Sequence, residues 1–79
     1  MARDFYAETE HVAQALLAEG LVDEAESLRG AVAAGATATE ILMRVRWHLR
    51  GIERANRVRD NATTRIVREL LAELDKVLS

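Results

Sequence analysis

The two histidines of this sequence are its only side chains that titrate near neutral pH and readily bind metals, so their neighbours matter first. Glu8 and His11 have the Glu-x-x-His spacing that carboxylate-bridged di-iron bundles use. Such a site needs a second Glu-x-x-His motif, but the residue three positions before His48 is Val45. The sequence therefore predicts no metal site, and it predicts that His48 is a partly buried structural residue.

Nucleophilic catalysis lacks its usual components. There are no cysteines, and neither Ser27 nor Ser79 has a histidine and an acid nearby in the sequence. Neither a Walker loop nor a dinucleotide-binding glycine pattern is present. We therefore expect a protein that is not an enzyme, with no cofactor and no small-molecule substrate.

A row of arginines is the strongest chemical signal in the chain. On a helical wheel they fall within one arc beside the main apolar face of their helix, and they are Arg46, Arg50, Arg54 and Arg57. Guanidinium groups in such a row suit a partner's carboxylates or phosphates. Residues 1–40 carry a balance of −6 and residues 41–79 one of +4, within a net charge of −2. The alternative is therefore that the arginines face the acidic first two helices of the same chain, or water.

A second apolar line on the same helix consists of Trp47, Gly51, Ala55 and Val58, with Met43 near its edge. This line either covers another helix of the bundle or stays exposed as an interface, where tryptophan and arginine are enriched. The predicted partner-binding residues are Trp47, Arg46, Arg50, Arg54, Arg57 and Met43.

The elements that must position these residues are helices. Gly20 and Gly35 end periodic apolar segments, and two helix starts have capping-box spacing, Asp23 with Glu26 and Thr37 with Glu40. The periodicity predicts helices over residues 4–19, 24–34, 38–58 and 61–78. Short joints between them predict an all-α, compact up-down bundle of about four helices, forming a single domain over residues 1–79.

The composition supports this fold class. The chain has 79 residues, no proline, four glycines and 49% hydrophobic residues. Its longest uncharged stretch, residues 30–39, is too short to span a membrane, and from the charged start of the sequence we expect no signal peptide. We expect a cytoplasmic protein that resembles small all-helical bacterial proteins.

Residues 31–41 resemble the bacterial helix-turn-helix motif, with alanine, Gly35, Thr37 and Ile41 at similar spacings. That resemblance implies a DNA-binding regulator that uses the arginine-rich third helix, with Arg44, Arg46 and Arg50 available to DNA. Gly30 and Arg44 occupy positions where the motif has apolar residues. The primary hypothesis is therefore a protein–protein interaction module that self-associates or neutralises a partner protein, and DNA binding is the alternative.

Overall fold

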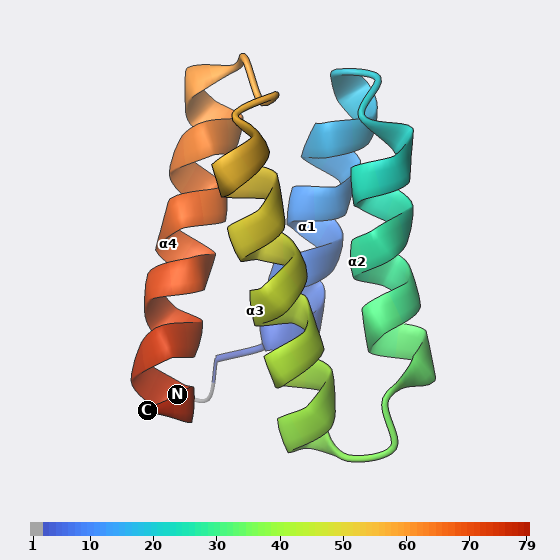
Figure 1. The fold of residues 1–79 in the computed structure, drawn as a ribbon, viewed down its shortest axis with the longest axis vertical. Helices are drawn as coiled ribbons and strands as arrows, with labels where there is room; N and C mark the ends of the chain where they lie inside the picture. The colour runs from blue at the N-terminus through green and yellow to red at the C-terminus, as the bar shows by residue number, and fades with distance from the viewer. Residues whose placement is uncertain (1–2) are drawn as a thin grey trace.

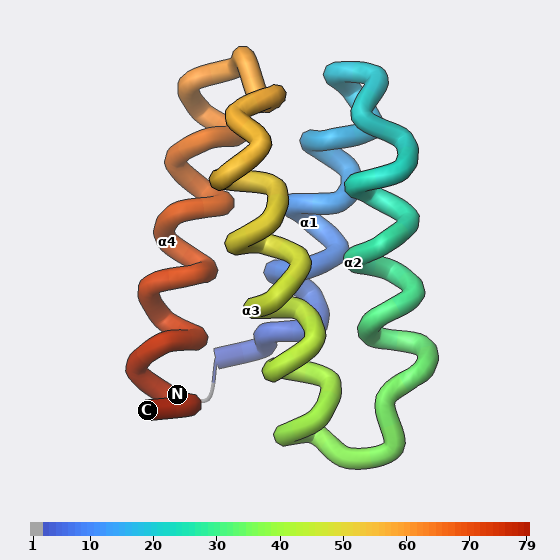
Figure 2. Tube along the Cα trace, in the orientation of Figure 1, coloured from blue at the N-terminus to red at the C-terminus, as the bar shows by residue number. Residues whose placement is uncertain are grey.

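The computed structural model describes residues 3–79 as an up-down bundle of four helices (Figure 1). The helices are α1 (Phe5–Ala18), α2 (Val22–Ala34), α3 (Ala38–Ala55) and α4 (Asn61–Leu78). Each helix packs against its neighbour in the chain, and α4 returns to pack against α1. The tube view shows that successive helices run in opposite directions (Figure 2). The predicted all-α bundle is confirmed.

The core is built from leucines contributed by every helix. Leu16 of α1, Leu28 of α2 and Leu49 of α3 have no exposed surface, and Leu70 and Leu74 of α4 complete this layer. They recur with the helical period that the sequence predicted for the inner faces. Full burial of a leucine side chain contributes roughly 1.5–3 kcal/mol, so this layer supplies a large part of the stability of a small fold.

The turn from α1 to α2 confirms one predicted boundary and corrects another. Gly20 adopts φ +81°, and its N–H and that of Leu21 donate to Leu17 and Leu16, which is a Schellman ending. The predicted start at residue 24, with Asp23 as the cap, is wrong. The helix already begins at Val22, because the tight turn lets the Leu21 carbonyl accept the first helical hydrogen bond from Ala25.

The turn from α2 to α3 follows the prediction. The Thr37 side chain accepts a hydrogen bond from the Glu40 N–H at 3.1 Å, as its capping-box spacing predicted. A side chain at Gly35 would collide with that of Ile41, so the close approach of α3 requires glycine there. This compact turn places α3 directly beside α2.

The third helix is shorter than predicted. It ends at Ala55 instead of residue 58, because Asn56 adopts the left-handed conformation with φ 55°. The Glu19 carboxylate at the end of α1 then accepts the Arg59 N–H at 2.8 Å. The connection between α3 and α4 is thereby held against the end of α1, and Asp60 caps α4 by accepting from the Thr63 N–H.

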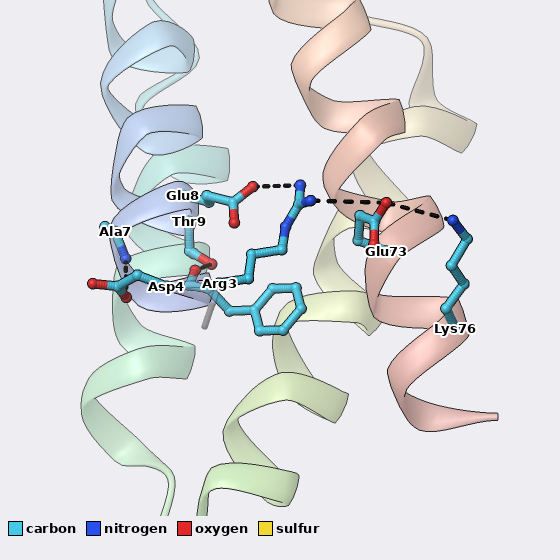
Figure 3. A network of polar contacts seen from close by, with 8 residues as sticks. Arg3, Asp4, Ala7, Glu8, Thr9, Glu73 and Lys76 are labelled. Atoms are coloured by element: carbon cyan, nitrogen blue, oxygen red, sulfur yellow. Dashed lines mark hydrogen bonds and ion pairs between the residues drawn. The ribbon is translucent and has the colours of Figure 1, made fainter. Parts of the chain in front are cut away.

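Polar contacts near the start of α1 link it to α4 (Figure 3). The Arg3 guanidinium lies 2.7 Å from the Glu8 carboxylate and 3.8 Å from that of Glu73. Glu73 in turn pairs with Lys76 at 3.5 Å. These exposed pairs add little stability individually, but they bridge the two helices that are farthest apart in the sequence.

Replacement of Asn56 tests the left-handed ending of α3. We expect Asn56→Ala to lower the free energy of unfolding by roughly 1 kcal/mol, because alanine lacks the short polar side chain with which asparagine hydrogen-bonds locally and tolerates the left-handed conformation. Asn56→Gly should keep or raise the stability, since glycine adopts positive φ without that cost. Urea unfolding followed by circular dichroism measures both, and equal stabilities of the two variants would contradict this geometry.

Candidate functional site

The outer side of α3 exposes the largest side chain in the chain. Trp47 is 72% exposed and Met43, one turn before it, is 49% exposed. Gly51, Arg54 and Ala55 continue the same side and are also exposed. We name these five residues the Trp47 surface. The sequence left open whether this apolar line covers another helix or stays exposed, and in the structure it stays exposed.

A shallow groove of about 200 Å³ separates the Trp47 surface from α2. Asp23, Glu24 and Ser27 line it from α2, and a second set lines it from α3, namely Trp47, His48, Gly51, Ile52 and Ala55. The Trp47 ring meets the His48 ring edge to face, with their centroids 5.0 Å apart. Both rings line the groove. The sequence analysis did not predict the α2 residues of this groove, although Asp23 and Ser27 share one side of that helix at i, i+4 spacing.

Two of the predicted arginines turn toward α4. The Arg50 guanidinium lies 2.7 Å from the Asp75 carboxylate, and that of Arg46 lies 3.6 Å from the same oxygen. The alternative prediction placed the partners of these arginines in the acidic first two helices, whereas Asp75 belongs to the basic half of the sequence. Neighbours across a bundle are set by helix order, so α4 is as close to α3 as α2 is.

The other two arginines differ from each other. Arg57 pairs with Glu24 of α2 at 2.6 Å, as the alternative prediction expected for the acidic half. Arg54 is exposed and has no carboxylate within 4.0 Å among residues 3–79. The row of arginines therefore divides, and Arg54 is the member that combines an unpaired charge with a position beside Trp47.

The geometry of α2 and α3 differs from that of a helix-turn-helix. The two helices lie side by side and antiparallel (Figures 1 and 2), whereas the DNA-binding motif crosses its helices at roughly 90–120°. Arg46 and Arg50, two of the three arginines assigned to DNA in that hypothesis, are held by Asp75. The predicted helix-turn-helix therefore lacks the expected crossing of its two helices, and two of its three arginines already pair with a carboxylate.

The other histidine, His11 of α1, borders a different groove. His11 lines a groove of about 360 Å³ between α1 and α4, with Glu8 and Glu69 beside it and Val12, Ile66 and Leu70 as apolar lining. Within residues 3–79, no three histidine, cysteine or acidic side chains are grouped as a metal ion requires. In the same part of the chain, no helix is long and apolar enough to cross a bilayer.

His48, which lines the groove beside Trp47, should make the stability of the fold depend on pH. Burial lowers the pKa of His48 below its ordinary value of 6.5, because the imidazolium form loses hydration there. The unfolded chain therefore binds the proton more tightly, and stability should fall as the pH drops below 6.5 toward the pKa of the folded state.

We expect His48→Gln to reduce this fall in the free energy of unfolding, measured by urea denaturation at about pH 7.5 and about pH 5.5. The control is His11→Gln, which changes an exposed histidine of α1 and should retain the fall. An unchanged pH dependence in His48→Gln would show that other groups cause it.

Comparison of the chain with protein-family models, with curated proteins and with solved structures found no match. What the protein binds is therefore inferred from its own surface. The observation with the most chemical content is the exposed Trp47, with Met43 and the unpaired Arg54 beside it on α3.

Proposed function

We propose that this chain is a non-enzymatic protein-interaction module and that it binds its partner through the Trp47 surface. The single observation that carries this proposal is the 72% exposure of Trp47 in the middle of a well-packed helix. An indole in that position does not stabilise the core. Tryptophan is among the residues most enriched at the energetic centres of protein interfaces.

The exposed indole offers a substantial binding energy. A tryptophan side chain buries about 150–250 Å² when covered, and each Å² of apolar surface contributes about 25 cal/mol. Covering the exposed part of Trp47 would therefore supply roughly 3–4 kcal/mol before the cost of association. Met43 adds a flexible apolar side chain that adapts its shape to a partner.

Arg54 supplies the charge of the Trp47 surface. Arg54 has no carboxylate partner among residues 3–79, so a partner's acid could bind it without breaking an existing pair. Arg46, Arg50 and Arg57 each contact a carboxylate within the fold. A guanidinium has five N–H donors, so these three can still donate to a partner from their remaining groups.

Truncation of the indole tests the proposal. Wild-type protein, Trp47→Ala and Val77→Ala are immobilised and exposed to a soluble extract of the cells that make the protein, with added purified chain to allow self-binding. Val77 is a matched control, because it is also an exposed apolar residue, at 54%, but lies on α4. We expect at least one bound protein to fall tenfold or more with Trp47→Ala, a loss of about 1.4 kcal/mol, and to persist with Val77→Ala.

Circular dichroism and urea unfolding of the three proteins accompany this measurement. Trp47→Ala should remain folded, with a free energy of unfolding within about 0.5 kcal/mol of wild type, as for most surface substitutions. An unfolded Trp47→Ala would show that the indole is a stability element. That result, or the absence of any partner that depends on Trp47, would overturn the proposal.

A DNA titration separates the proposal from the helix-turn-helix alternative. Fluorescence anisotropy of labelled duplex DNA at low salt detects phosphate-driven binding, which is strongest under that condition. We expect flat anisotropy, because the chain carries a net charge of −2 and Arg46, Arg50 and Arg57 each pair with a carboxylate of the fold. Salt-sensitive binding that weakens in an Arg46→Ala, Arg50→Ala double variant would instead support DNA binding.

A further inference from the structure

We infer that the partner of the Trp47 surface is a second copy of this chain, bound face to face through α2 and α3 about a twofold axis parallel to the helices. This inference rests on the proposed function, since it uses the Trp47 surface as the contact. Three features support it, and they are two glycines without a role in the fold, the register of α2 against α3, and the charges on each helix.

Gly30 and Gly51 have no structural reason to be glycine within the bundle. Both lie inside helices, both are exposed, and a Cβ added to either would meet no atom within 4 Å. Gly35 and Gly20 differ, because the first makes room for Ile41 and the second adopts positive φ. Glycine weakens a helix relative to alanine. Because nothing in the bundle requires glycine at these two positions of α2 and α3, we infer that the missing side chains leave space for a binding partner.

The antiparallel packing sets which residues lie at one level. The Glu24–Arg57 ion pair fixes the beginning of α2 beside the end of α3, and Asp23 and Ala55 line the same groove. Along the groove, Ser27 follows on α2 while Gly51 and Trp47 follow on α3. Gly30 is one turn beyond Ser27, so it lies near the level of Trp47.

A twofold axis parallel to the helices leaves every residue at the same height along the bundle and brings α2 of one copy opposite α3 of the other. It places α3 of one copy against α2 of the other, running antiparallel as within the chain. Trp47 then faces Ser27 and Gly30 of the partner subunit, where the missing side chain of glycine leaves room for the indole. The relation is reciprocal, so the dimer buries both tryptophans.

The charges favour this pairing over contact between two copies of α3. Asp23 and Glu26 are exposed on α2, Arg54 is exposed on α3, and none of them has an ion-pair partner among residues 3–79. Asp23 lies at the level of Ala55, so the exchange brings Arg54 toward Asp23 of the partner subunit. Packing α3 against α3 would instead bring arginines of both copies together, which is repulsive.

The face has enough area for a stable dimer. The Cα trace measures 30 × 23 × 22 Å, so one side of the bundle spans roughly 700 Å² before side chains are added. A standard interface buries about 800 Å² per partner. The contact must therefore use most of the α2–α3 side, and the Trp47 surface lies within it.

Sedimentation equilibrium of a charge-swapped pair tests both the partner and the geometry. Alone, Arg54→Glu places a new carboxylate opposite Asp23 of the partner subunit, and Asp23→Arg places two arginines together, so each should dimerise at least tenfold more weakly than wild type. Mixed in equal amounts, the two variants regain an attractive contact, and a heterodimer should form with much higher affinity than either variant has for itself. Val77→Ala should behave as wild type.

A steric variant gives an independent result. Gly30→Leu should fold, because the position is open, yet it should weaken the dimer tenfold or more by filling the place of the indole. Gly30→Ala, a smaller addition, should weaken it less. Dimerisation that is unaffected by Gly30→Leu, or charge variants that do not recover on mixing, would overturn this geometry.

The proposed function can survive the loss of this inference. A wild-type chain that stays monomeric at millimolar concentration would exclude the second copy as partner. Capture of a different protein that depends on Trp47 would then still support the interaction module. Loss of every interaction that depends on Trp47 would overturn both.

Discussion

The rotation of α3 about its own axis is the constraint on which the exposed surface depends. Val45, Leu49 and Ile52 are buried against the other helices, and this fixes the inward side of α3. Because successive residues advance by about 100°, Trp47 falls nearly opposite that side. The core and the Trp47 surface are therefore two consequences of one packing choice, and the indole cannot turn inward without exposing Leu49.

The order of the helices then determines which charged side chains can pair. The sequence separates acidic residues 1–40 from basic residues 41–79, but an up-down bundle places the acidic α2 and the mixed α4 on either side of α3. Asp75 of α4 pairs with Arg46 and Arg50. Glu24 of α2 pairs with Arg57. The outward arginine, Arg54, keeps its charge for solvent or a partner.

Local signals allowed much of the fold to be predicted. The Thr37 cap, the Gly20 ending and the main apolar side of α3 each depend on a few neighbouring residues, and the structure confirms them. The early end of α3 depends on Asn56, a weaker signal than glycine for the left-handed conformation. The exposure of Trp47 had no local signal, because a helix with two apolar sides can bury either one and only the packing of all four helices decides between them.

The glycines connect stability to the proposed interaction. Gly30 and Gly51 each weaken their helix by about 1 kcal/mol relative to alanine, in a chain whose size leaves it only a small core. Nothing within the bundle recovers this loss, since both positions face open space. A partner that packs against these glycines beside Trp47 would recover the lost stability. The proposed dimer would use both features of the α2–α3 side, the open glycines that lower helix stability and the exposed Trp47.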